Sequence, residues 1–190
     1  MLRIQEPEVK MKRLSLPRLL LCSLGLLLPL FVTACAEPPP SPPEPLPPET
    51  WFSLSLGDTP LQVQLAVTPQ ERSRGLMFRE ELGDTEGMLF VFSRGERRSF
   101  YMRNTSIPLQ IGYFRENGEL AEIRRLIPHD LTPVPSTRSD IQFALEVNPG
   151  WFRENGVRIG DSLPLEKVAE ALQQRGFAPS DYGLPNPVAP

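Results

Sequence analysis

The chain has 190 residues, 23 of them prolines, and a net charge of −3 at pH 7. Its first 34 residues carry five basic and two acidic side chains, so the rest of the chain has a charge of −6. An acidic domain of this size has no electrostatic attraction for nucleic acid, and we expect no nucleic-acid partner. Cysteine occurs only at positions 22 and 35 and histidine only at position 129, which excludes disulfides, a cysteine nucleophile and a multi-histidine metal site beyond residue 35. We therefore expect no metal or other cofactor.

Residues 1–34 have the pattern of a bacterial lipoprotein signal peptide. Basic residues up to Arg18 precede a leucine-rich run over residues 19–31, and the small residues Val32-Thr33-Ala34 lead directly into Cys35. A cysteine in this place resembles a lipobox, in which the cysteine is lipidated and becomes the mature N-terminus. A plain secretory signal is one alternative, and a transmembrane helix, which needs ~20 apolar residues, is another. The pattern predicts an exported protein that is anchored to the cell envelope through lipid on Cys35, outside the cytoplasm.

Prolines mark both ends of the predicted folded region. Residues 35–50 hold the lipidated cysteine and a proline-dense tract, which predicts an extended polyproline-II spacer. A proline-motif ligand for another protein is the alternative. Residues 178–190 contain four prolines and predict a disordered tail. Residues 51–177 remain as a single globular domain, of a size that can enclose a hydrophobic core.

Apolar residues that alternate or run continuously predict short strands separated by turns. In chain order, these strands span residues 51–56, 61–67, 87–92, 99–102, 109–114, 120–127, 142–147, 157–159 and 162–165. After the second strand, Thr68, Pro69 and Glu71 predict a short helix with a capping box. One helical turn is expected over residues 149–155, and an amphipathic helix is expected over residues 166–175. Together they predict an α+β domain: a small, mostly antiparallel β barrel-like or sandwich-like sheet with one short capped helix and a C-terminal helix.

Several blocks of this sequence together resemble one known family. The blocks are Gly75-Leu76-Met77-Phe78-Arg79, Gly87-Met88-Leu89-Phe90-Val91-Phe92, Phe100-Tyr101-Met102-Arg103-Asn104-Thr105-Ser106-Ile107-Pro108-Leu109, Ala144-Leu145-Glu146-Val147 and Ile159-Gly160-Asp161. In order and spacing they resemble domain-of-unknown-function family 192, a bacterial and archaeal domain often found behind a secretion signal. The resemblance covers roughly residues 61–165. It implies a compact, mostly β domain that acts outside the cytoplasm, and it implies no particular activity.

The sequence departs from the family pattern at three positions. Tyr101 stands where the family more often has Trp, Arg103 stands where Lys is usual, and Gln110 stands where the family usually has Asp. The last departure matters most for chemistry. If the family carboxylate were a catalytic base, Gln110 could not replace it, because an amide does not take up protons at working pH.

The block Met102-Arg103-Asn104-Thr105 is one candidate binding site. It ends a predicted strand and enters a loop, where polar side chains on a rigid sheet often bind ligands. Arg103 could bind a carboxylate or phosphate, and Asn104 and Thr105 could hydrogen-bond to a ligand. The alternative is that the short polar residues only stabilise a local turn while Arg103 pairs with a buried acid.

Glu146 is the second candidate, because it lies inside an apolar strand. It faces solvent, or it pairs with Arg103 or Arg79 as an embedded charge that needs a partner. We expect Arg103 and Asn104 to lie close to Glu146. Arg79 and Asp161 are weaker candidates for the same site.

These features predict a membrane-anchored envelope lipoprotein that is a non-catalytic binding or accessory module. Its partner would be a small polar ligand, a glycan or another envelope protein. The alternative is a hydrolase or lyase that uses Glu146 or Asp161, with Arg103 as an anion clamp. A deep pocket in which Arg103 meets a carboxyl of raised pKa would favour the enzyme, and a shallow, satisfied surface would favour the binding module.

Overall fold

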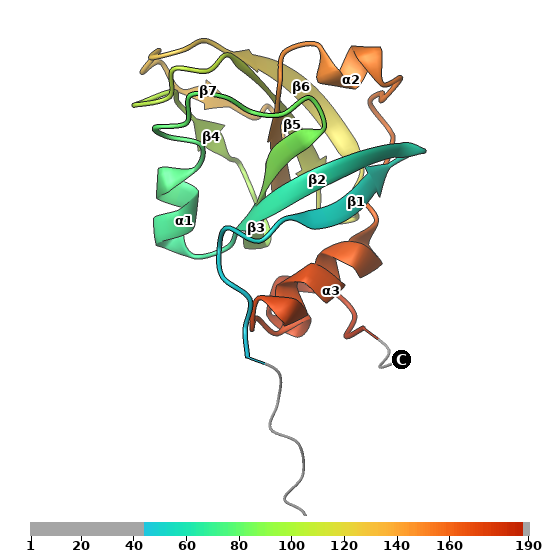
Figure 1. Cartoon of the computed structure of the whole chain (residues 1–190). Coiled ribbons are helices and arrows are strands. Elements are labelled where there is room, and N and C mark those ends of the chain that lie inside the picture. The colour runs from blue at the N-terminus through green and yellow to red at the C-terminus, as the bar shows by residue number, and fades with distance from the viewer. Residues whose placement is uncertain (1–43, 188–190) are drawn as a thin grey trace, which may run out of the picture. The chain divides into compact units, whose positions relative to one another are not determined.

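The computed structural model describes residues 44–187 (Figure 1). The signal sequence and Cys35 lie outside these residues. The elements are β1 (Phe52–Leu56), β2 (Thr59–Ala66), α1 (Pro69–Arg74), β3 (Glu86–Glu96), β4 (Ser99–Phe100), β5 (Leu109–Arg115), β6 (Leu120–Leu126), β7 (Val134–Pro135), β8 (Ile141–Val147), α2 (Trp151–Glu154), α3 (Leu165–Gln174) and the 3₁₀ helix η1 (Pro179–Tyr182). Among the residues described, no helix has the length and apolar character needed to cross a membrane.

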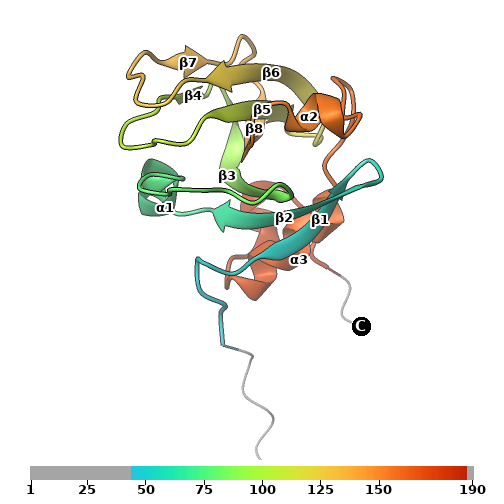
Figure 2. The ribbon, with the colours of Figure 1, turned by 45° about the horizontal axis from the view of Figure 1, so that its top comes forward.

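Six strands form one open, mixed sheet in the order β1-β2-β3-β8-β5-β6, and β4 and β7 form a separate ribbon. Every neighbouring pair in the large sheet is antiparallel except β2 and β3, which run parallel. That pair is parallel because α1 and the following loop carry the chain back to the start of β3. Figures 1 and 2 both show α3 against β1 and β2, at the opposite end of the domain from the β4–β7 ribbon. The predicted α+β class is confirmed in its sandwich-like form.

The central strand β8 is buried along its whole length, between two hydrophobic cores. Phe143, Leu145 and Val147 enter the first core, which α2 and α3 cover. Ala144 lies in the second core with residues that include Phe90 and Met102. Because side chains alternate along a strand, Glu146 shares the face of the second core.

The predicted capping box at the start of α1 is confirmed. The Glu71 amide donates to the Thr68 hydroxyl over 3.2 Å, and the Glu71 carboxylate accepts from the Thr68 amide over 2.9 Å. The helix ends at Gly75, where φ is +46° and ψ is −135°. This positive φ needs glycine, but it is not the left-handed helical cap that the sequence suggests.

The last predicted strand pair, over residues 157–159 and 162–165, does not form. These residues make a turn that pairs instead with the hairpin joining β5 and β6. The Leu120 amide donates to the Asp161 carbonyl, the Gly160 amide donates to the Leu120 carbonyl, and the Leu163 amide donates to Gly118. The hairpin therefore uses the backbone groups that a local strand pair would need.

The ordered domain is longer than the predicted residues 51–177. At the N-terminal side, the Leu46 amide donates to the Gln174 carbonyl over 2.7 Å. At the C-terminal side, the expected disordered tail instead forms η1, and Leu184 is buried in the first core. The Gln142 amide group donates to the Tyr182 carbonyl over 2.6 Å, which fixes this segment to β8. The proline content predicts disorder, but burial of Leu184 and Pro179 and packing of Tyr182 against the first core order this segment.

Arg175 joins the N-terminal segment to the rest of the domain. Its side chain is only 3% exposed and forms an ion pair with Glu71 over 2.6 Å. The same guanidinium donates to the carbonyls of Leu46 and Leu65, each over 3.1 Å. One buried cation thus connects the chain entry, β2, α1 and the end of α3.

We predict that Arg175→Ala lowers the free energy of unfolding by about 3–5 kcal/mol, because it leaves Glu71 and two carbonyls without their partner. Urea denaturation followed by circular dichroism measures the change. Arg153→Ala is the matched control, since that side chain is 83% exposed and its loss should cost less than about 0.5 kcal/mol. Equal effects of the two changes would contradict the structural role of Arg175.

Candidate functional site

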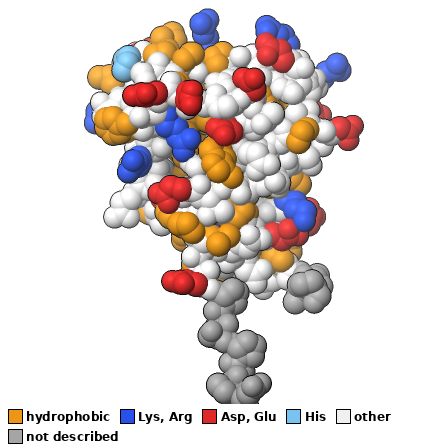
Figure 3. Space-filling model, viewed as in Figure 1, with side chains coloured by type: hydrophobic (Ala, Val, Ile, Leu, Met, Phe, Trp, Pro, Cys, Tyr) orange, Lys and Arg blue, Asp and Glu red, His pale blue; other side chains and the backbone are white. Residues whose placement is uncertain are grey.

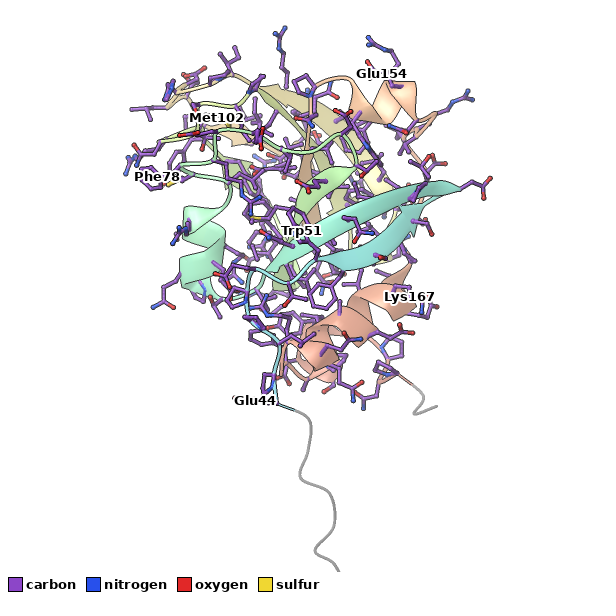
Figure 4. The ribbon with its side chains drawn as sticks, viewed as in Figure 1. Glu44, Trp51, Phe78, Met102, Glu154 and Lys167 are labelled. Atoms are coloured by element: carbon purple, nitrogen blue, oxygen red, sulfur yellow. The ribbon has the colours of Figure 1, made fainter. Side chains whose placement is uncertain are left out.

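A cleft of about 320 Å³ lies between α1 and the segment that follows β4, above the second-core face of the sheet. It is lined by Pro69, Arg72, Ser73, Arg74, Gly75, Leu76, Met77, Phe90, Phe92, Ser99, Phe100, Tyr101, Met102, Thr105 and Glu146. Figure 4 shows Met102 and Phe78 close together above α1, where the two loops meet. The Phe78 amide donates to the Asn104 carbonyl over 2.8 Å and holds these loops together.

Glu146 is the acid in this cleft. Its register partners on the neighbouring strands are Met88 and Ile111, so its side chain rises from an apolar stretch of the sheet. The residue is only 6% exposed, and no hydrogen bond or ion pair joins its carboxyl to any of residues 44–187. Its oxygens are not among the fully buried unpaired atoms, so they reach the solvent in the cleft. Burial in this apolar surrounding raises the pKa of Glu146 to about 8. At neutral pH the carboxyl is therefore mostly protonated and uncharged.

The expected pairing of Arg103 with Glu146 is wrong. Arg103 is exposed, does not line the cleft, and stacks its guanidinium over the Tyr101 ring at 5.1 Å. The chain turns here because Asn104 adopts a left-handed φ of +53°. The Thr105 hydroxyl donates to the Arg103 carbonyl over 3.1 Å, which stabilises the turn. Arg103 and Asn104 thus belong to a turn, whereas Met102 and Thr105 are buried and line the cleft.

Two further predicted site residues also lie elsewhere. The Arg79 guanidinium donates to the Gln64 side chain and lies 5.5 Å from the centre of the Trp51 ring, in a neighbouring groove. The Asp161 carboxylate accepts from the Arg158 amide over 2.7 Å within an exposed turn. Both side chains stabilise local structure. Of the seven candidates, the structure brings together only Met102, Thr105 and Glu146.

Comparison with known protein families identifies the family of this chain. A family model for domain-of-unknown-function family 192 (DUF192), described as an uncharacterized ACR, matches residues 53–165. The chain belongs to this family. Within the DUF192 match lie β1 to β8 and Glu146, together with the other residues that line the cleft.

Two solved structures are similar to this DUF192 domain. One is a protein of unknown function from Novosphingobium aromaticivorans, 34% identical over 60% of this chain and 82% of that chain, with a TM-score of 0.54. The other, from Sinorhizobium meliloti, is described as a candidate transcription regulator; it is 31% identical over 58% of this chain and 88% of that chain, with a TM-score of 0.54. No curated protein matches the chain.

Gln110, the departure from the DUF192 pattern that seemed to matter most, lies away from the cleft. Its side-chain oxygen accepts from the Gly150 amide over 2.9 Å, just before α2. Its neighbour Ile111 shares the face of Glu146, so Gln110 points to the other face of the sheet. An amide oxygen and a carboxylate oxygen can both accept this bond, so the position needs an acceptor rather than a base.

The cations and aromatic rings that line the cleft were not among the residues predicted from the sequence. Arg72 donates to the Val67 carbonyl and, over 3.2 Å, to the Val91 carbonyl, and its guanidinium lies 4.9 Å from the centre of the Phe92 ring. Arg74 is exposed at the cleft and forms no side-chain hydrogen bond or ion pair within residues 44–187. The capping box that fixes α1 was a usable signal for their placement, because it sets the helix whose last turn carries both arginines.

The face of the domain seen in Figure 1 is mixed in charge. Figure 3 shows basic and acidic side chains interspersed over it, with hydrophobic side chains between them. The exposed aromatic residues Phe78 and Tyr101 are 71% and 44% exposed. This face therefore carries no large area of a single charge that would attract a highly charged polymer.

We predict that Glu146 makes the fold less stable as pH rises from about 4.5 to about 8. Below this window the carboxyl is neutral in both states, and within it the unfolded chain ionises while the folded protein stays protonated. Each pH unit of the window costs about 1.4 kcal/mol, which gives at most ~5 kcal/mol in total. Glu146→Gln removes the titration, so the variant should become the more stable protein at pH 8.

Urea denaturation of both proteins at pH 5 and pH 8 measures this difference. Glu166→Gln, at an exposed position in the first turn of α3, is the matched control and should leave the pH dependence of wild type intact. If the free energies of unfolding of wild type and Glu146→Gln differ by the same amount at pH 5 and pH 8, the carboxyl does not have a raised pKa and the buried, unpaired state is refuted.

Proposed function

We propose that this protein is a lipid-anchored envelope lipoprotein whose domain binds a small polar ligand in the cleft over Glu146. The observation that carries the proposal is a buried carboxyl that opens to a cleft and has no partner in the domain. The apolar surrounding of this carboxyl costs free energy whenever it ionises, although its oxygens reach the solvent in the cleft. A ligand that hydrogen-bonds to Glu146 would remove this cost when it binds.

The contents of the cleft support binding rather than catalysis. Glu146 is its only acid, and the residues that line it include no histidine or cysteine. Nucleophilic catalysis by Ser73 or Ser99 would need an adjacent general base to activate the hydroxyl. The volume of about 320 Å³ suits a small molecule, so a small polar ligand is favoured over a long glycan or an envelope protein.

A hydrolase or lyase is the second candidate, and one observation favours it. A carboxyl with its pKa raised to about 8, in a cleft, has the property required of a general acid at neutral pH. Glu146 would be the acid in that case. Arg103 and Asp161 have no part in this version, because neither lines the cleft.

We predict that a screen of small polar compounds, followed by thermal unfolding, finds ligands that stabilise wild type and fail to stabilise Glu146→Gln. A ligand at 100 times its dissociation constant should add about 2.7 kcal/mol to the free energy of unfolding. Asp161→Asn is the control and should respond like wild type, since Asp161 lies outside the cleft. Ligands that stabilise all three proteins equally would place binding elsewhere. If wild type chemically converts a ligand into a product and Glu146→Gln does not, the hydrolase or lyase proposal is favoured over the binding module.

The anchor is tested separately. Cys35→Ser should move the protein from the membrane fraction to the soluble fraction, because it removes the thiol that carries the lipid. Carbonate-washed membranes and immunoblotting measure the distribution, with Cys22→Ser as the matched control that stays anchored. A Cys35→Ser protein that still sediments with washed membranes would contradict the lipoprotein assignment.

A further inference from the structure

The charged groups of the cleft are separated by depth. Glu146, 6% exposed, lies on the sheet at the base, and the exposed Arg74 lies on α1 at the edge. The walls between them are aromatic. Phe90 and Phe100 meet edge to face with their ring centres 4.9 Å apart, and Phe92 lies beside them.

The base of the cleft suits a positively charged group. No cation of the domain lies close enough to Glu146 to favour its charged form. An ammonium group from a ligand would supply that charge in a poorly solvated place, where an ion pair is strong if its geometry is good. The ring of Phe92 already lies against the guanidinium groups of Arg72 and Arg98, at 4.9 Å and 3.8 Å, so the walls contribute apolar contact rather than a free ring face.

The edge of the cleft suits an anionic group. Arg74 has no side-chain partner within residues 44–187. Arg72 is less available, because it already donates to the carbonyls of Val67 and Val91. A carboxylate at Arg74 would also relieve the repulsion between the two arginines and an incoming cation.

On the basis of the proposed function, we propose that the ligand is a small zwitterion of the amino-acid type. Its ammonium group pairs with Glu146, its carboxylate pairs with Arg74, and its side chain packs against the aromatic wall. Binding moves one proton from the neutral carboxyl of Glu146 to the solvent, so that the ammonium meets a carboxylate. The other titratable or charged groups that face this position are Arg72 and Arg74 of α1, Tyr101 beyond β4 and Tyr113 of β5; β3 contributes only apolar side chains.

The test uses three probes that differ in one charge at a time: L-phenylalanine, N-acetyl-L-phenylalanine without the cation, and L-phenylalaninamide without the anion. Isothermal titration calorimetry of the full-length protein in detergent measures their affinities at pH 7. L-phenylalanine should bind, and the dissociation constant of each derivative should be at least about ten times higher. This is the usual effect of removing one charged partner. Titrations in buffers of different ionisation enthalpy should show close to one proton released per L-phenylalanine bound.

Two variants test which residue binds the ammonium group of the ligand and which binds its carboxylate. Glu146→Gln should bind L-phenylalanine and its N-acetyl derivative with similar affinity and release no proton. Arg74→Ala should bind L-phenylalanine and its amide with similar affinity. Arg103→Ala, an exposed arginine outside the cleft, is the control and should keep the discrimination of wild type.

Other outcomes overturn the zwitterion and separate it from the proposed function. Tighter binding of the N-acetyl derivative, or proton uptake on binding, would show that the cleft takes an anion with Glu146 as a neutral donor. No binding of L-phenylalanine or of a panel of other amino acids and dipeptides, together with Glu146-dependent ligands from the polar screen, would refute the ligand class and leave the binding function. Absence of Glu146-dependent ligands in both experiments would refute the binding function itself.

Discussion

The burial of β8 on both faces is the constraint on which the rest of the structure depends. A strand covered on both sides offers little solvent to a charged side chain, so an ionisable group on it is favoured when it is paired or neutral. Glu146 takes the second course, because burial raises its pKa to about 8 and no counter-charge is near. Glu146 is also one of the residues that line the cleft, so its carboxyl can be reached from there.

Arg175 and Glu146, the two most deeply buried ionisable residues in the second half of the domain, differ in their partners. Arg175 is fully engaged, with one carboxylate and two carbonyls around its guanidinium. The Glu146 carboxyl has no hydrogen bond or ion pair with any of residues 44–187, and its oxygens reach the solvent in the cleft. The first arrangement is what a structural charge requires. The contrast shows that the fold can surround a buried charge with partners and that it leaves this carboxyl open to the cleft.

The parts of the fold that local chemistry determines could be predicted from the sequence, and the parts set by packing could not. The capping box of α1 and the alternation of β2 and β8 depend on neighbouring residues, and both agree with the structure. Alternation along β8 puts Glu146 on the face opposite Phe143, Leu145 and Val147, but it does not reveal what covers that face. A local turn at Asn104 was one of the two interpretations of its block, but nothing in the neighbouring residues shows that Arg103 is left exposed and does not pair with Glu146. The ordered segment around Leu184 was missed for the same reason, since its burial depends on the distant first core.

Gln110 changes how an absent acid should be interpreted. From the sequence, an amide in place of the usual family carboxylate argued against catalysis, because an amide cannot act as a base. The structure places this position on the opposite face from Glu146, where it accepts one hydrogen bond from the Gly150 amide. The substitution therefore keeps a structural acceptor and leaves the chemistry of the cleft unchanged. Any chemistry of the cleft therefore depends on the residues that line it, among which Glu146 is the only acid, and not on position 110.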